Sequence, residues 1–264
     1  MLTEVKNQLK VNYLSIKYGL MREMINKFSF LANIIFMIIN NSCFIIQWVV
    51  LYSLKESIGG YTFKQMLLLW GIAASTFGVS RFFFKKAFTL SETINTGKLD
   101  AFLVQPKNVL LSAITTDVEV SAIGDLLYGY VILIIYGITL ENFLLFTIFT
   151  ILGGLIITCV SVIANSLAFW FNMSDVLADT INNMMITFGT YPKDIFTGIV
   201  KILLYTIIPV GIANYIPIDL IINFNIYGFL VVFIVTILLV VLSFYIFNKG
   251  LKRYSSSNLM SSRI

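Results

Sequence analysis

Residues 184–224, MMITFGTYPKDIFTGIVKILLYTIIPVGIANYIPIDLIINF, decide the predicted architecture. The stretch is apolar, yet it holds three of the chain's four prolines and two lysines, namely Pro192, Lys193, Lys201, Pro209 and Pro217. Proline removes a backbone donor and interrupts a helix, and an unsatisfied backbone group is costly in hydrocarbon. We therefore expect a re-entrant hairpin at about 191–222, made of two short helices that dip into the membrane and return under the cover of other protein.

The composition is that of an all-α protein that crosses a membrane several times. Of 264 residues, 58% are hydrophobic and 12% are charged, and the mean hydropathy is +0.91. The net charge is +5, but the basic residues lie at segment edges, which indicates orientation in a membrane and no nucleic-acid partner. Histidine is absent, and Cys43 and Cys159 lie in separate apolar runs, so no catalytic, metal or cofactor site and no disulfide framework is expected in this chain.

Residues 1–27 predict an amphipathic helix at the membrane interface. Val5, Leu9, Tyr13, Ile16, Leu20 and Met24 form one stripe, and basic side chains occupy the remaining surface. Such a helix binds by apolar burial and by contact with anionic lipid in the bilayer. A cytosolic helix packed on its own protein is the alternative. Charges recur up to Lys27, so no signal peptide is expected.

The rest of the chain, 28–264, is expected to form one transmembrane domain with six spans. These lie at about 28–54, 61–84, 118–140, 145–171, 175–190 and 226–248. Polar residues of the first span must face protein or a cavity, namely Asn33, Asn40, Asn41 and Gln47. In the second span, Gly71 with Ser75 and Ala74 with Gly78 place small residues where another helix can approach closely.

The distribution of lysine and arginine predicts that both termini are cytoplasmic. Fourteen of these residues lie in the N-terminal segment, the 81–108 connection and residues 249–264, and four lie on the other side. Only an even number of spans places all fourteen on one side, which favours six spans with a hairpin that opens outward.

Two features of the cytoplasmic half are candidates for function. Glu119 and Asp125 of the third span are intramembrane carboxylates, either functional or lying at interface depth. A short amphipathic helix is expected over about 92–105, and Pro106 ends it. Its side chains divide between an apolar face and polar flanks, namely Leu99, Phe102 and Leu103 against Lys98 and Asp100.

These features together resemble the permease subunit of a type-2 ABC exporter. The resemblance rests on the amphipathic N-terminal helix, on the stretch TGKLDAFLVQP at 96–106, and on Tyr191-Pro192, Pro209 and Tyr215-Ile216-Pro217. The second stretch is similar to the G-x-L-D-x-x-L-x-x-P sequence of one branch of that family. The third set is similar to that branch's re-entrant hairpin between spans five and six.

The resemblance implies a division of labour among several chains. Permeases of this kind pair with an identical or homologous permease, and each docks on a cytosolic ATPase that binds ATP and magnesium. The 92–105 segment would be the coupling helix that fits a groove on the ATPase, and the hairpin would close the outer end of the path. A bacterial plasma membrane is the expected location, which agrees with the abundance of Ile, Asn and Lys.

The residues agree with that division. No G-x-x-x-x-G-K-[ST] sequence occurs, so any ATP must be hydrolysed by another chain, and no enzymatic activity is expected here. An apolar helix face suits docking in a groove, although it would also suit a helix lying flat on lipid. Lys193 and Lys201 could contact an anionic substrate or extend to the interface. The polar content of the spans favours an amphipathic or hydrophobic cargo such as a peptide, drug or lipid.

Two other functions remain open on the sequence. An ion-gradient-driven secondary transporter would be expected to show internal repeats and charges near the midplane; no convincing repeat is present and such charges are few. An intramembrane enzyme would need clustered His, Asp or Arg, which the spans lack.

Overall fold

The computed structural model describes residues 2–171 and 174–255, which form helices joined by loops and contain no β-strand. In chain order the elements are α1 (Leu2–Glu23), α2 (Lys27–Leu54), α3 (Phe63–Phe84), η1 (Lys85–Ala87), α4 (Leu90–Asn95), α5 (Asp100–Leu103), α6 (Val109–Ile114), α7 (Ser121–Gly137), α8 (Leu140–Ser166), η2 (Leu167–Phe169), α9 (Ser174–Gly189), η3 (Lys193–Ile195), α10 (Gly198–Leu203), a π-helical turn (Gly211–Tyr215), α11 (Ile216–Ile222) and α12 (Ile226–Leu251).

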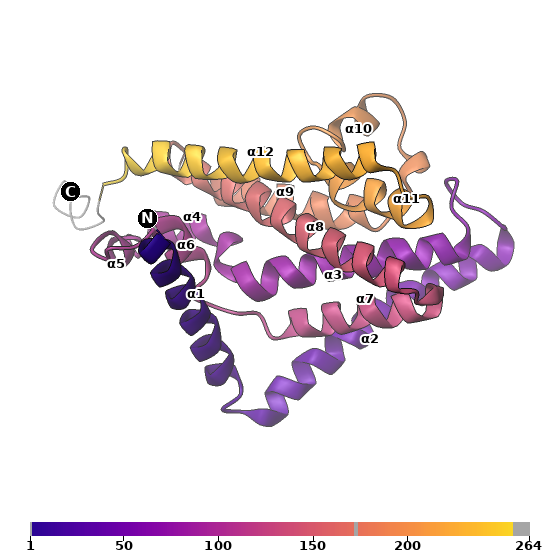
Figure 1. Ribbon diagram of the computed structural model, residues 1–264, viewed down its shortest axis with the longest axis horizontal. Helices are drawn as coiled ribbons and strands as arrows, with labels where there is room; N and C mark the ends of the chain where they lie inside the picture. Colours follow the sequence, from indigo (N-terminus) through magenta and orange to yellow (C-terminus); the bar gives the residue numbers. More distant parts are fainter. Residues whose placement is uncertain (1, 172–173, 256–264) are drawn as a thin grey trace.

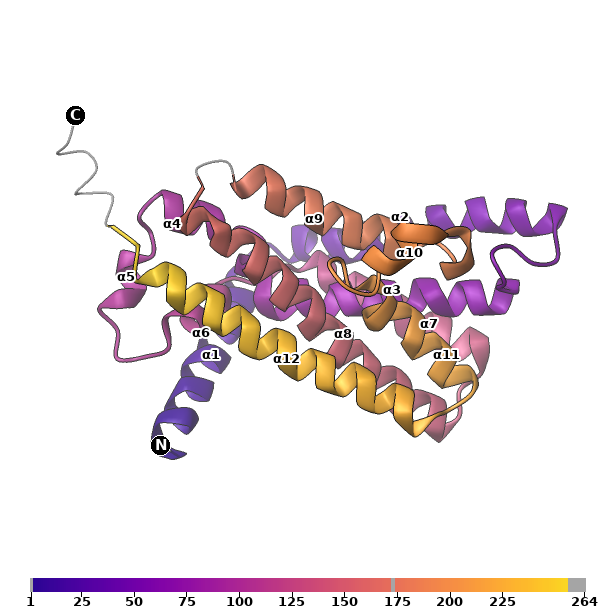
Figure 2. The ribbon, with the colours of Figure 1, turned by 90° about the horizontal axis from the view of Figure 1, so that it is seen from above.

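The long helices run between two ends of the molecule that differ in content. One end holds α4, α5 and α6 together with the start of α1 and the last turn of α12 (Figure 1). The other end holds α10, α11 and the turn between α2 and α3 (Figures 1 and 2). The first is called the inner end and the second the outer end, following the orientation that the basic residues predict.

The buried core is built on α3 and α8. Most side chains of these two helices are buried, whereas α2 and α12 are also apolar but mostly exposed. In water such exposed apolar helices would be unstable, but in hydrocarbon their exposed side chains meet lipid. The arrangement is therefore a central pair of helices surrounded by helices that face the membrane.

Small residues allow α3 and α7 to pack closely, as the sequence predicts for α3. A Cβ added at Gly129 of α7 would lie 1.8 Å from Ser75 Oγ and 2.5 Å from the backbone oxygen of Gly71. A Cβ added at Gly78 would lie 2.8 Å from Leu126 of α7. Both sides of this contact therefore depend on residues with little or no side chain.

Local signals explain where the long helices begin. The side chain of Thr62 caps the first turn of α3, and Gln65 bonds back to the Thr62 amide, which together form a capping box. Asn26, Thr139 and Asn225 cap α2, α8 and α12 in a similar way. The helices begin at or directly after these caps, within about five residues of the starts expected from hydropathy.

Among the described residues, four helical stretches are long and apolar enough to cross a membrane: Lys27–Leu54, Phe63–Asn95, Leu140–Phe169 and Ile226–Leu251. They correspond to the first, second, fourth and sixth predicted spans. The third corresponds to α7, an apolar helix of 17 residues at the lower limit of a span. The fifth corresponds to α9, which has 16 residues, carries Asp175 and Asp179, and is shorter and less apolar than a typical span. The count of six spans therefore stays a prediction.

Candidate functional site

A cavity of about 460 Å³ lies between α2, α3, α7 and α9. Its lining extends from Arg81 and Glu119 toward the inner end to Trp48 and Tyr191 toward the outer end. The volume falls in the range of small-molecule binding sites in proteins. The cavity is therefore the candidate binding site.

Amide side chains of α2 line the cavity. Asn40, Asn41 and Gln47 all lie on its wall, as expected for polar residues of a membrane span. Asn33 does not; it is exposed near the start of α2. Asn40 and Gln47 are seven residues apart and so share a helix face, which is the sequence signal that identifies this wall. Thr187 of α9 contributes a hydroxyl.

The structure brings the intramembrane carboxylates to the same cavity. Glu119 lies just before α7 and pairs with Arg81 of α3 at 3.3 Å. Asp125 of α7 is buried and accepts a hydrogen bond from Asn41 Nδ2 at 2.7 Å. Both side chains line the cavity, and their functional role stays a prediction.

Aromatic side chains form much of the remaining wall. The rings of Phe44 and Trp70 stack with centroids 5.3 Å apart. Trp48 and Tyr191 meet edge to face at 5.7 Å and lie toward the outer end. Of these four residues, the sequence points only to Tyr191, through the predicted hairpin. Aromatic residues make up 15% of the chain, so their presence alone does not mark a site.

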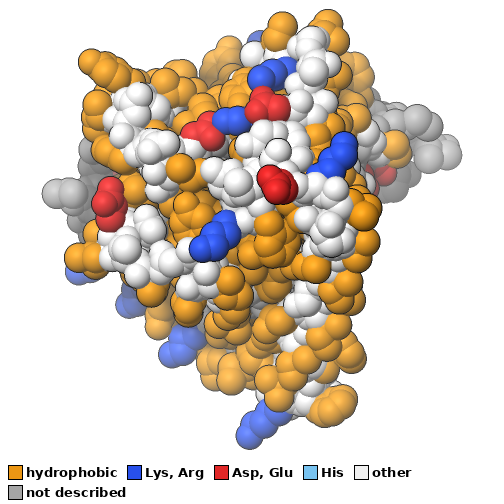
Figure 3. Space-filling view, turned by 90° about the vertical axis from the view of Figure 1, so that its right-hand side faces the viewer, with side chains coloured by type: hydrophobic (Ala, Val, Ile, Leu, Met, Phe, Trp, Pro, Cys, Tyr) orange, Lys and Arg blue, Asp and Glu red, His pale blue; other side chains and the backbone are white. Residues whose placement is uncertain are grey.

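The predicted hairpin residues form a cover at the outer end, defined here as residues 191–222. Lys193 Nζ lies 2.7 Å from Asp219 Oδ1, and Lys201 Nζ lies 3.1 Å from Asp194 Oδ1. Basic and acidic side chains are interspersed on this end of the molecule (Figure 3). Both lysines are therefore paired with acidic residues of the cover itself. This structural role stands beside the two considered from the sequence, contact with an anionic substrate and extension to the membrane interface.

The turn between α2 and α3 packs on this cover. Gly59 and Gly60 have φ values of +54° and +76°, which favour glycine. A Cβ at Gly59 would lie 2.8 Å from Pro192 Cβ, and a Cβ at Gly60 would lie 2.7 Å from Asp194 Oδ2. The pair therefore forms the turn between α2 and α3 and is also the place where the cover packs against that turn.

Tyr215 anchors the cover to α9. Its side chain is fully buried, and its hydroxyl donates a hydrogen bond to the backbone oxygen of Phe188 at 2.6 Å. Asn214 Nδ2 bonds to the oxygen of Gly189 at 3.4 Å. Pro209 and Pro217 are buried within the same segment. The cover is thus attached to the end of a helix that lines the cavity.

At the inner end, the predicted 92–105 helix is two short helices. Thr96 and Gly97 end α4, and Gly97 has a φ of +74° that a continuing helix does not allow. The chain turns there and forms α5 over Asp100–Leu103. The segment 90–106 is called the inner segment below.

One predicted docking residue is wrongly assigned. Leu99 is fully buried in the chain's own hydrophobic core, so it is not part of an exposed face. Phe102 is partly buried against the same core. The exposed large apolar side chains of the inner segment are Leu103, 43% exposed, and Val104, 85% exposed. The helical pattern identified apolar residues correctly but could not show that the break at Gly97 turns Leu99 inward.

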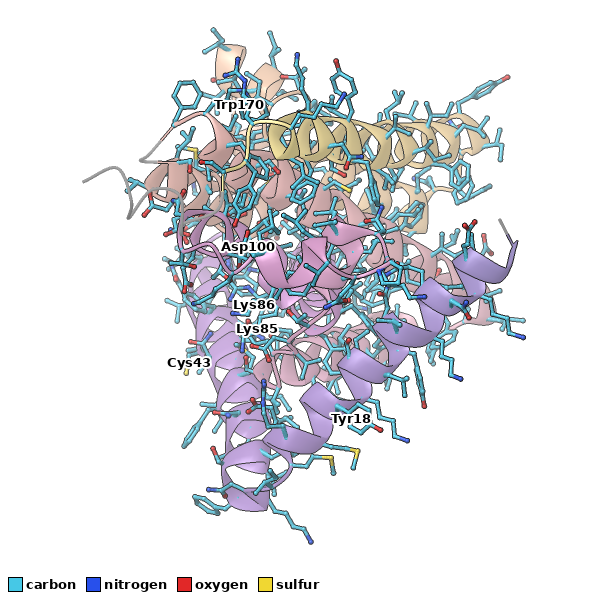
Figure 4. All side chains as sticks on the ribbon, turned by 90° about the vertical axis from the view of Figure 1, so that its left-hand side faces the viewer. Tyr18, Cys43, Lys85, Lys86, Asp100 and Trp170 are labelled. Atoms are coloured by element: carbon cyan, nitrogen blue, oxygen red, sulfur yellow. The ribbon has the colours of Figure 1, made fainter. Side chains whose placement is uncertain are left out.

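The polar residues of the inner segment have partners in the same chain. Lys98 pairs with Glu92 at 2.9 Å. Asp100 lies beside Tyr254, where burial and then this carboxylate raise the pKa of Tyr254 to about 12. Figure 4 views the inner end and shows Asp100 and the basic Lys85 and Lys86 near the middle of it.

The inner segment is attached firmly to the helical core. The backbone N–H of Ser91 donates to Asn165 Oδ1 of α8 at 3.1 Å, and both residues are buried. Leu90 and Ile94 of α4 are buried as well, and η1 joins this segment to α3. A force on the inner segment would therefore reach both central helices.

Helix α1 is held to the same end by charge. Asp117 contacts Arg22 of α1 and Lys85 of η1. Partial burial opposes ionisation of Asp117, but the two cations outweigh it and keep its pKa below the usual range. The apolar stripe of α1 remains exposed at Val5, Leu9 and Tyr13, as expected for a helix that lies on lipid.

An apolar helical molecule with a lined cavity and differing ends is typical of a membrane transport subunit. The sequence profile of the family described as ABC-2 family transporter protein matches residues 28–258. The chain belongs to this family, as the sequence resemblance indicated. No curated protein and no solved structure shows significant similarity to it.

Proposed function

We propose that this chain is the membrane-spanning subunit of an ATP-driven exporter of amphipathic or hydrophobic molecules. ATP and magnesium would bind to cytosolic ATPase subunits, and a second permease, identical or homologous, would complete the path. The observation that carries the proposal is the position of the cavity. It lies between an inner segment with exposed apolar residues and an outer cover held by ion pairs.

The proposed membrane arrangement has six spans in a bacterial plasma membrane. The four long stretches together with α7 and α9 make up the six spans, and the cover at 191–222 is the re-entrant hairpin. Both termini are then cytoplasmic, in agreement with the distribution of lysine and arginine. Helix α9 ends and α12 begins at the same end of the molecule, which supports the hairpin assignment (Figures 1 and 2).

The proposed mechanism is alternating access driven from the inner end. Closure of two ATPases on ATP pushes the inner segment of each permease. Because this segment is bonded to α8 and continuous with α3, the push moves the helices around the cavity. The cover then separates from the turn at Gly59 and Gly60, and the cavity opens outward.

A nucleotide-dependent change in the accessibility of Gln47 tests this mechanism. In a chain with Cys43→Ser and Cys159→Ala, the variant Gln47→Cys places one thiol on the cavity wall. In cells or vesicles that hold the native ATPase, we expect an impermeant maleimide added outside to label this thiol faster after trapping with ATP and vanadate. Labelling at a rate that nucleotide does not change would contradict alternating access.

The matched control is Lys55→Cys in the same background. Lys55 follows α2 directly and is exposed at the outer end. We expect this thiol to react with the external reagent at a rate that is independent of nucleotide. The comparison separates opening of the cavity from a general change in the membrane or the reagent.

A further inference from the structure

Asp125 is a buried carboxylate with few partners. It is 8% exposed and accepts one hydrogen bond, from Asn41 Nδ2 at 2.7 Å. Among the residues that the structure describes, no lysine or arginine forms an ion pair with it. An ionised carboxylate can accept about four hydrogen bonds, so most of its acceptor capacity is left for another group.

The nearby arginine is already engaged. Arg81 contacts both carboxylate oxygens of Glu119 at 3.3 and 3.4 Å, and its guanidinium lies 4.9 Å from the centre of the Phe88 ring. The charged lining of the cavity is therefore two carboxylates and one guanidinium, which leaves one negative charge. A buried charge without a counter-ion is costly, and a bound cation would offset that cost.

The rest of the wall suits the body of an organic cation. Phe44 stacks on Trp70, and Trp48 and Tyr191 lie toward the outer end. Aromatic faces attract cations, and they also bury the apolar part of a ligand. A cavity of about 460 Å³ accommodates a drug-sized molecule.

We propose that the cavity binds hydrophobic organic cations, with Asp125 as the counter-ion and the aromatic side chains around the apolar body. This inference rests on the proposed function, because it takes the cavity as the substrate site. It adds the charge of the substrate, which the proposed function leaves open. Hydrophobic anions of the same shape are excluded by the negative charge.

A pair of probes with the same shape and opposite charge tests the proposal. Tetraphenylphosphonium is a hydrophobic cation, and tetraphenylborate is its anionic counterpart. Binding of each to the purified full-length chain in mild detergent is measured by equilibrium dialysis against micelles without protein. We expect saturable binding of the cation, at least about tenfold tighter than any protein-dependent binding of the anion.

Variants at Asp125 identify the group responsible. Asp125→Asn is expected to weaken binding of the cation by about tenfold or more, while Asp125→Glu keeps it within about threefold. Glu141→Gln makes the same change in net charge at an exposed site outside the cavity and is expected to leave binding unchanged. Size-exclusion profiles check that each variant is folded.

Two results would overturn the proposal: wild-type chain that binds the anion as tightly as the cation, or no saturable cation binding up to the solubility limit. Neither result needs a variant, so both hold even if Asp125→Asn fails to fold. Neither measurement requires ATP or an ATPase. A protein that exports a neutral or anionic molecule would therefore fail this test and still pass the accessibility test at Gln47.

Discussion

A chain in which Leu103 and Val104 are both replaced by aspartate is expected to lose its ATPase partners. These are the exposed apolar side chains of the inner segment, and docking of a short helical segment in a groove depends on such anchors. On docking, a carboxylate at each position would be buried in the groove of the ATPase without a counter-ion. Recovery of the ATPase with the tagged permease should fall to background.

The control for this variant is Leu140→Asp. Leu140 is 77% exposed, and it lies in the first turn of α8 at the outer end, where an acidic residue is tolerated. Leu99→Asp is a different case, because burying a charge in the core should reduce the yield of folded chain. If the double variant retains the ATPase at the wild-type ratio, the inner segment lies on lipid or is free, and the coupling assignment is wrong.

Replacing Tyr215 by alanine is expected to give the largest loss of stability among changes in the outer cover. The substitution empties a fully buried aromatic site and removes the bond to the oxygen of Phe188. Aromatic-to-alanine changes in cores cost about 3–5 kcal/mol. For a chain of this size the apparent melting temperature in detergent should fall by roughly 10 °C.

One further variant separates the loss of the ring from the loss of the hydroxyl, and another is a control at an exposed site. Tyr215→Phe removes the hydroxyl and keeps the ring, so it should cost about 1 kcal/mol. Tyr227→Ala removes a tyrosine that is 76% exposed at the same end and should leave the melting temperature within about 2 °C of wild type. A melting temperature for Tyr215→Ala that matches that of Tyr227→Ala would show that the cover is not anchored through Tyr215.

The long apolar helices were predictable because their signal is local. Hydropathy places α2, α3, α8 and α12 within a few positions. The prolines at 192, 209 and 217 predicted a segment of short helices for the same reason, since proline acts on its own backbone. The sequence could not decide whether α7 and α9 complete six spans, because α7 lies at the lower limit of length and α9 is shorter and less apolar.

The site was only partly predictable because its lining comes from separate helices. Asp125 and the amides of α2 stood out as polar residues in apolar sequence, and they meet in the cavity. Trp70 and Phe44 did not stand out, because an aromatic residue in a membrane span is common. Leu99 was assigned to the wrong environment because helical periodicity does not show which neighbour covers a face.

The central claim is that a separate ATPase drives this membrane subunit, and co-purification tests it most directly. The chain is tagged in its native host, extracted in mild detergent, and its partners are identified and quantified by mass spectrometry. The account predicts a Walker-type ATPase in stoichiometric amount, and a second permease if the pair is heteromeric. A chain recovered intact and alone, without any ATPase, would contradict the account and favour a transporter driven by an ion gradient.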